Sequence, residues 1–168
     1  MQKLADYKLV VGLGNIGSSY QNSRHNLGFI FVDLLRSKFG FNEFALKNSN
    51  YFLSSGFVDL MKPATYMNNS GLAVLSYLTK KKCASSQILV IHDELNLKEG
   101  EIKFKIGGGH GGHNGLRSIS NAIGSEYHRI RLGIGRPEGD VAHYVLQSTD
   151  LSIWNERINV WCEENKIW

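Results

Sequence analysis

The chain has 168 residues, of which 42% are hydrophobic and 20% are charged. These values are typical of one folded domain and exclude a disordered chain. The sequence has no apolar run as long as a membrane span, and residues 1–8 lack the apolar core of a signal peptide. We therefore expect a cytoplasmic protein without a membrane anchor. Cys83 and Cys162 fit neither a disulfide framework nor a cysteine zinc site.

The charge is unevenly distributed along the chain. The 19 basic and 15 acidic residues give a formal net charge of +4. The segment from Asp150 onward holds two basic and four acidic residues, which leaves residues 1–149 at +6. A basic body is typical of proteins that bind a phosphate-bearing partner, although the same charge can serve solubility alone.

The first half of the chain predicts a strand, a helix and a hairpin. A short β-branched run at 7–12 predicts a strand, and a loop rich in Gly, Asn and Ser follows it. Apolar residues at helical spacing then predict a helix that ends at Gly40. Alternation over 44–62 indicates hairpin strands, and Ser70 is expected to cap a helix that runs to about residue 82.

The second half predicts the same alternation of strands and helices. The segment 87–92 contains the continuously apolar run 88–91, as in a strand buried on both faces. The other expected elements are strands at 101–106, 130–134 and 141–146, a glycine loop at 107–115, a helix at 116–123, and an amphipathic helix at about 150–166. This order predicts an α/β fold over residues 1–168: a single-domain, three-layer globule with a twisted mixed β-sheet flanked by helices.

A glycine pattern after the first strand, Gly12-x-Gly14-x-x-Gly17, matches the fingerprint of a dinucleotide site. That site needs a helix to begin at the glycines, so that its N-terminus meets the pyrophosphate. Here the loop continues to about Asn26, and Asp33 falls within the first helix instead of at the end of a second strand. We therefore favour a tight turn, or a loop that aims Asn15, Tyr20 and His25 into a cleft.

Polar side chains that could carry out chemistry gather in four segments, 15–26, 66–71, 92–94 and 107–115. Loops at the carboxyl ends of strands are where open α/β sheets place their sites. These segments contain histidines, carboxylates and carboxamides, but no Gly-x-Ser-x-Gly motif and no cysteine. The combination favours a water molecule activated by histidine over a covalent intermediate.

Each candidate residue also has a purely structural interpretation. His25 could act as a base or cap the next helix, and Asp93 could orient an imidazole or end a strand. Asn68 and Asn114 could donate to an oxyanion or occupy turns. Glu94 is interpreted as a structural acid, and three histidines are interpreted as core or surface residues of strands, namely His92, His128 and His143.

Two histidines of the glycine loop, His110 and His113, have a spacing that could suggest zinc. No third ligand lies nearby in the sequence, so we expect no metal. Basic residues alternate on two predicted strands, as Lys103 with Lys105 and Arg129 with Arg131. If those strands are neighbours, the cations converge on a phosphate; otherwise they form a solvated face.

Taken in order along nearly the whole chain, these motifs resemble the bacterial peptidyl-tRNA hydrolase family. The matching segments are Val10-Val11-Gly12-Leu13-Gly14-Asn15, Ser23-Arg24-His25-Asn26-Leu27-Gly28, Tyr66-Met67-Asn68, His92-Asp93-Glu94-Leu95, Lys103-Phe104-Lys105, 107–116 and 128–135. The segment Gly-Gly-Gly-His-Gly-Gly-His-Asn-Gly is the most distinctive of them. The family usually has Pro where this chain has Ile16 and commonly continues into a basic C-terminal segment, whereas the tail here is acidic.

The resemblance implies hydrolysis of the ester that joins a peptide to tRNA, which recycles tRNA after release from the ribosome. It implies His25 as the base, Asp93 as its partner, and Asn15 as the residue that senses the blocked end of the substrate. Peptide and terminal adenosine would be contacted by Tyr20, Tyr66, Asn68 and Asn114, and the tRNA 5′ phosphate by Lys105 and Arg131. The family implies a monomer that needs no metal or cofactor.

Two alternatives remain open on the sequence. One is a catalytically inactive RNA-binding protein on the same fold, since fold does not determine function. The other is a metal-dependent hydrolase that uses His110 and His113, which chelator sensitivity would identify.

Overall fold

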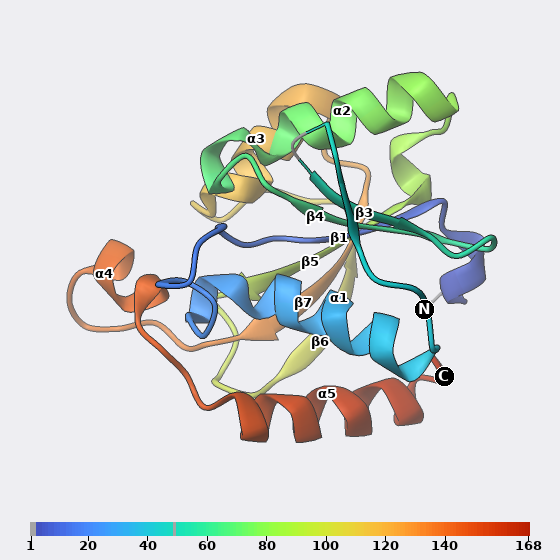
Figure 1. The fold of residues 1–168 in the computed structure, drawn as a ribbon. Coiled ribbons are helices and arrows are strands. Elements are labelled where there is room, and N and C mark those ends of the chain that lie inside the picture. The colour runs from blue at the N-terminus through green and yellow to red at the C-terminus, as the bar shows by residue number, and fades with distance from the viewer. Residues whose placement is uncertain (1–2, 49) are drawn as a thin grey trace.

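The computed structural model describes residues 3–48 and 50–168 as a single α/β domain with helices on both faces of a seven-stranded sheet (Figure 1). The expected fold class is confirmed. The strands are β1 (Leu9–Gly12), β2 (Ala45–Lys47), β3 (Asn50–Ser54), β4 (Asp59–Pro63), β5 (Ile88–Glu94), β6 (Ile102–Ile106) and β7 (His128–Gly133). The α-helices are α1 (Leu27–Lys38), α2 (Ser70–Lys81), α3 (Asn114–Ile123), α4 (Val141–Leu146) and α5 (Leu151–Glu164).

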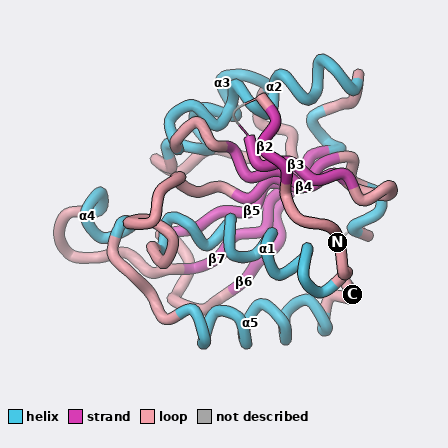
Figure 2. The backbone as a smooth tube through the Cα atoms, viewed as in Figure 1, coloured by secondary structure: helices cyan, strands magenta, loops and turns pink. Residues whose placement is uncertain are grey.

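The sheet is mixed, with the order β2-β3-β4-β1-β5-β7-β6. β1 pairs in parallel with β4 and β5, and β5 pairs in parallel with β7. The strands at both edges of the sheet pair antiparallel. On one side β2 pairs with β3 and β3 with β4, and on the other side β6 pairs with β7. The carboxyl ends of the four parallel strands therefore meet at one edge. In Figure 2 the start of α1 and the short helix α4 lie at the same end of the molecule.

Two apolar cores hold the layers together. One joins the sheet to α1 and α5, and the other joins it to α2 and α3. Strand β5 is buried along nearly its whole length, which agrees with its continuous apolar sequence and its central position. No helix among the described residues has the length and apolar character that a membrane crossing requires.

The glycines at the end of β1 serve close packing. A Cβ on Gly12 would lie 2.2 Å from the carbonyl oxygen of Gly28, and a Cβ on Gly14 would lie 2.7 Å from the Phe29 ring. Helix α1 begins only at Leu27. The Gly12-x-Gly14-x-x-Gly17 pattern therefore allows α1 to approach the sheet, and no helix starts at these glycines to receive a pyrophosphate.

Three predictions about local structure were wrong. The segment 141–146 is helix α4, because the Asp140 side chain accepts a hydrogen bond from the backbone N–H of His143 and caps it. His143 is thus on an exposed helix. Ser70 does not cap α2; it is the first helical residue, and its hydroxyl donates to the Met67 carbonyl. Helix α3 begins at Asn114, earlier than expected, because the His113 side chain caps it.

Candidate active site

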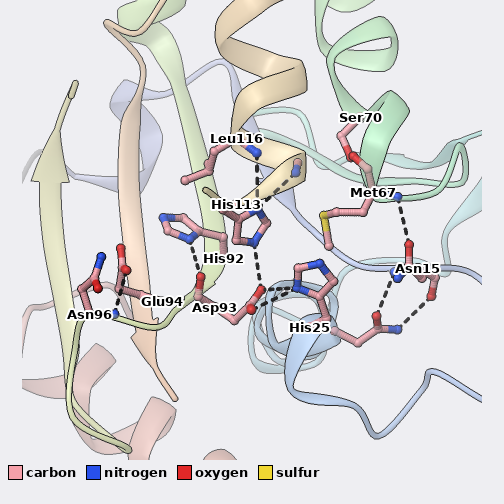
Figure 3. Close-up of polar contacts among 12 residues, drawn as sticks. Asn15, His25, Met67, Ser70, His92, Asp93, Glu94, Asn96, His113 and Leu116 are labelled. Atoms are coloured by element: carbon pink, nitrogen blue, oxygen red, sulfur yellow. Dashed lines mark hydrogen bonds and ion pairs between the residues drawn. The ribbon is translucent and has the colours of Figure 1, made fainter. Parts of the chain in front are cut away.

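The centre of the site is a hydrogen-bonded pair formed by His25 and Asp93 (Figure 3). His25 lies in the short 3-10 helix before α1, and Asp93 lies near the carboxyl end of β5. The Nδ1 atom of His25 is 2.9 Å from Oδ1 and 3.0 Å from Oδ2 of Asp93. Both residues are buried. The His25 side chain makes no cap for α1, and Asp93 does not end the strand as a turn residue would.

The pair stabilises the charged form of both partners. Burial lowers the pKa of His25, but the charge of Asp93 and its hydrogen bond outweigh this, so the pKa lies above its ordinary value of 6.5. Burial raises the pKa of Asp93, whereas the neighbouring His25 and His113 hold it well below its usual range. Asp93 is therefore a carboxylate at neutral pH. Its hydrogen bond fixes the proton of neutral His25 on Nδ1, which leaves Nε2 as the basic atom.

His113 is a second imidazole on Asp93. From the sequence it was considered only as a possible metal ligand with His110, and its contact with Asp93 was not predicted. Its Nε2 is 2.9 Å from Oδ1 of Asp93. Its Nδ1 accepts the backbone N–H groups of Gly115 and Leu116 at 3.1 and 3.3 Å and so caps α3. These contacts assign the proton to Nε2, because Nδ1 is used as an acceptor. A histidine directly before a predicted helix was the available signal.

Asn15 is held beside this pair by backbone contacts. Its Oδ1 accepts the backbone N–H of Met67 at 2.9 Å. The Asn26 side chain pairs with the Asn15 backbone at both its N–H and its carbonyl, each at 2.8 Å. The side-chain oxygen Oδ1 of Asn15 is therefore occupied, and the side-chain nitrogen Nδ2 has no hydrogen bond within residues 3–48 and 50–168. The free group that Asn15 offers is a donor.

A cavity of about 260 Å³ opens onto the pair. His25, Asp93 and His113 line it together with Asn114, the first residue of α3. Apolar residues of α4 form another part of its wall, namely Val141, Ala142 and Val145. The structure thus brings His25, Asp93 and Asn114 to one cavity.

The remaining predicted contacts lie outside this cavity. Asn68 is exposed in the 3-10 helix Met67–Asn69, directly after the residue that Asn15 contacts. Tyr66 is 55% exposed and has a φ of 58°, a conformation that non-glycine residues adopt only when their surroundings enforce it. Tyr20 is half-buried in the loop before α1, where its N–H donates to the Gly17 carbonyl.

The two basic strands are neighbours, as the phosphate hypothesis requires. β6 and β7 pair antiparallel with Lys103 opposite Arg131 and Lys105 opposite Arg129, so all four side chains share one face. Lys105 and Arg131 are diagonal neighbours, and neither forms an ion pair among the described residues. Arg129 is not available to a ligand, because it is buried and its guanidinium donates to the carbonyls of Gly108 and Gly109. These hydrogen bonds hold the glycine loop against β7.

The only three-residue cluster of possible metal ligands among the described residues is His25, Asp93 and His113. It does not include His110, whose Nδ1 accepts the Gly112 N–H. A metal on Nε2 of His113 would require the proton on Nδ1, where two backbone N–H groups already point. The donor set therefore fits a hydrogen-bonded triad and does not fit a metal centre.

Fold and site together define a class of protein: an α/β domain with a histidine hydrogen-bonded to a buried carboxylate in a cavity at the edge of its sheet. The sequence model of the peptidyl-tRNA hydrolase family matches residues 9–162. The chain is 50% identical over 143 residues to a peptidyl-tRNA hydrolase of Aliarcobacter butzleri, covering 82% of this chain and 77% of that protein. It is 46% identical over 146 residues to one of Rickettsia canadensis, covering 83% and 79%.

A crystal structure of peptidyl-tRNA hydrolase from Acinetobacter baumannii superimposes with a TM-score of 0.82 at 39% identity, covering 95% of this chain and 85% of that one. The chain belongs to the peptidyl-tRNA hydrolase family.

Proposed function

We propose that this chain hydrolyses the ester bond between peptide and tRNA in peptidyl-tRNA released from ribosomes, and so returns tRNA to translation. The observation that carries the proposal is the His25–Asp93 pair, whose geometry leaves Nε2 of His25 free at a cavity. An RNA-binding protein without activity would not need this pair, and nothing here favours that alternative. The protein acts in the cytoplasm as a monomer in this proposal.

The reaction follows from the proton positions. Nε2 of neutral His25 takes a proton from water as the oxygen attacks the ester carbonyl carbon. Asp93 stabilises the imidazolium that forms. The bond between the carbonyl carbon and the ribose oxygen then breaks, and the imidazolium returns its proton to that ribose oxygen. The proposal assigns Asn68 and Asn114 as donors to the oxyanion. Asn114 lines the cavity and Asn68 follows Met67 outside it, and neither carboxamide makes a hydrogen bond within the described part of the chain.

Asn15 supplies the discrimination between blocked and free substrates. Its Oδ1 is occupied by the Met67 N–H, so its Nδ2 can only donate. A peptidyl or N-acyl group offers a carbonyl oxygen to that donor. The free ammonium of an ordinary aminoacyl-tRNA offers only N–H groups, so donor would face donor and the polar group would remain unpaired.

The tRNA is placed on the side of Lys105 and Arg131. Two cations about 7–8 Å apart on diagonal positions can contact one terminal phosphate from both sides. Tyr20 and Tyr66 offer rings on which bases of the single-stranded acceptor end can stack. The basic residues would supply affinity without reading sequence, which suits a substrate class of many tRNAs.

One experiment tests the proposal directly. Release of N-acetyl-amino acid from N-acetyl-aminoacyl-tRNA is compared with release of amino acid from the unblocked aminoacyl-tRNA, for the wild type and for His25→Ala. We expect hydrolysis of the blocked substrate alone and its loss in the variant, with tRNA binding retained. Tight tRNA binding without hydrolysis by the wild type would instead identify a binding protein.

A further inference from the structure

A second cavity, of about 450 Å³, is lined by Asn15 and shares no lining residue with the His25–Asp93 cavity. Its wall includes Gln21, Phe29, Asp33, Tyr51 and Lys62, and it also touches Asn26, the residue after His25. The volume is that of an ordinary ligand pocket. Part of this wall comes from α1 and from strands β3 and β4, which supply no residue to the first cavity.

An unusual lysine lies in this cavity. The Lys62 side chain is only 16% exposed, and its Nζ is 2.6 Å from Oδ1 of Asp33. Three aromatic rings surround the ammonium, with centroids at 4.6 Å for Phe44, 5.6 Å for Tyr51 and 5.7 Å for Phe29. Asp33 supplies the only hydrogen bond to it from residues 3–48 and 50–168, so two of its three N–H groups remain for a ligand.

Asp33 adds a negatively charged hydrogen-bond acceptor to the cavity, beside the positively charged donor Lys62. Its side chain is 46% exposed, and only one of its two oxygens is in contact with Lys62. A carboxylate and an ammonium side by side can accept from an N–H group and donate to a carbonyl at the same time. A peptide main chain presents these two groups in every residue, whatever its side chain.

The topology indicates which part of the substrate reaches this cavity. Across the sheet, the order is β4 with Lys62, β1 leading to Asn15, β5 with Asp93, then β7 and β6 with Arg131 and Lys105. Lys62 also lies on the α1 face with Leu60, whereas Arg131 lies on the α2–α3 face with Tyr127. The ester lies between them at His25. If tRNA leaves toward the cations of β6 and β7, the peptide leaves past Asn15 toward Lys62.

We propose that the cavity around Lys62 and Asp33 is a peptide subsite that holds the main chain of residues beyond the one esterified to tRNA. Lys62 donates to a peptide carbonyl, Asp33 accepts a peptide N–H, and Tyr51 packs against the chain. The proposal rests on the proposed function and deepens it, because it assigns the main chain of the substrate peptide beyond Asn15 to this second cavity.

The test compares two substrates that differ only in length. N-acetyl-aminoacyl-tRNA ends near Asn15, and an N-acetyl-tripeptidyl-tRNA with the same tRNA and the same esterified residue reaches the cavity. We measure kcat/KM for both with the wild type, Lys62→Met and Asp33→Asn. Lys47→Met is the matched control, because Lys47 is exposed on the neighbouring strand β2 and does not line this cavity.

We expect the wild type to favour the tripeptidyl substrate. Lys62→Met should lower kcat/KM for it about tenfold, the effect of losing a hydrogen bond to a charged group, and leave the short substrate within twofold. Asp33→Asn, which keeps an oxygen for Lys62, should act in the same direction, and the control should change neither value.

Equal losses on both substrates would assign the pair to general structure or to the tRNA side and would overturn the subsite. Unchanged values on both substrates would show that the cavity is unused. Wild-type hydrolysis of the short substrate without a length preference rejects the subsite alone, whereas hydrolysis of neither substrate rejects the proposed function as well.

Discussion

Asp93 is the residue on which the geometry of the site depends, because its carboxylate holds two imidazoles at once. Oδ1 receives both Nδ1 of His25 and Nε2 of His113 at 2.9 Å. One imidazole is the proposed base, and the other connects the carboxylate to the start of α3. The side chain that orients the base is therefore itself oriented by a helix.

Activity is expected to rise with pH as His25 loses its proton. The Asp93 carboxylate raises the pKa of His25 above 6.5, so the rate should increase through an apparent pKa above that value. Asp93→Asn removes the charge that favours imidazolium, and the rising limb should shift to lower pH while kcat falls. Single-turnover hydrolysis measured against pH checks both effects. A rising limb at the same pH in Asp93→Asn would contradict the assigned coupling.

Substitutions of His113 separate its two contacts. His113→Asn keeps a side chain that can cap α3 but loses the donor to Asp93. The charge of Asp93 then acts more fully on His25, so the rising limb should shift to higher pH with little loss of stability. His113→Ala also loses the cap, which should cost about 0.5–2 kcal/mol more in the free energy of unfolding. Denaturant unfolding and the pH–rate profile of the two variants provide the readouts. Equal stability of both would reject the cap.

At the scale of elements, the contact between β1 and α1 places His25 near Asp93. Gly12→Ala would put a methyl group 2.2 Å from the Gly28 carbonyl oxygen, so α1 must move away from the sheet. We expect a loss of about 1–3 kcal/mol or more, visible as a fall in Tm of several degrees. Gly139→Ala is the control, because a Cβ there meets no heavy atom within 4 Å. Equal Tm values for the two variants would contradict the close approach.

The elements that sequence predicts well here are those with a clear period. The alternation of 101–106 and the continuous apolar run of β5 were interpreted correctly, because burial on one or two faces leaves a direct pattern. Segment 141–146 was interpreted as a strand because the short helix α4 buries only Val145 and shows no helical period. The Asp140 cap was the better signal there.

Some contacts of the candidate site could be predicted from the sequence and others could not, because the latter depend on tertiary structure. Asp93 and His25 were candidates from their positions at a strand end and a helix start, and the family resemblance implied that they act as a pair. The contact between His113 and Asp93 depends on the path of the glycine loop. That path is fixed in part by hydrogen bonds from Arg129. Arg129 is buried, whereas an arginine on an alternating strand is expected from sequence to be exposed. Contacts that require such tertiary placement leave no local pattern.

At the scale of the molecule, the basic residues of β6 and β7 are expected to dominate the salt dependence of tRNA binding. Lys105→Ala or Arg131→Ala should weaken binding and reduce the slope of log K against log salt by about one unit or less. The reason is that fewer counterions are released from the tRNA when one phosphate contact is missing. Binding of uncharged tRNA at several salt concentrations measures this. Arg129→Ala cannot serve as a control, because Arg129 supports the glycine loop. Lys38→Ala is a suitable control, because Lys38 lies in α1 on the other side of the molecule. Unchanged slopes in Lys105→Ala and Arg131→Ala would reject the clamp.

The buried imidazole of His92, next to Asp93 in the chain, makes the stability of the fold sensitive to acid. Burial lowers the pKa of His92 to about 3, whereas an unfolded chain takes up this proton near pH 6.5. The contribution to stability is therefore complete above pH 6.5 and is lost between 6.5 and 3 at up to about 1.4 kcal/mol per pH unit. Over pH 6 to 4.5, before most carboxylates titrate, the unfolding free energy should fall at least this steeply, because burial also lowers the pKa of His128, and the fall should be gentler in His92→Asn. A flat wild-type profile would contradict it. Proton uptake by buried histidines would then contribute to the limit that acid sets on the folded enzyme.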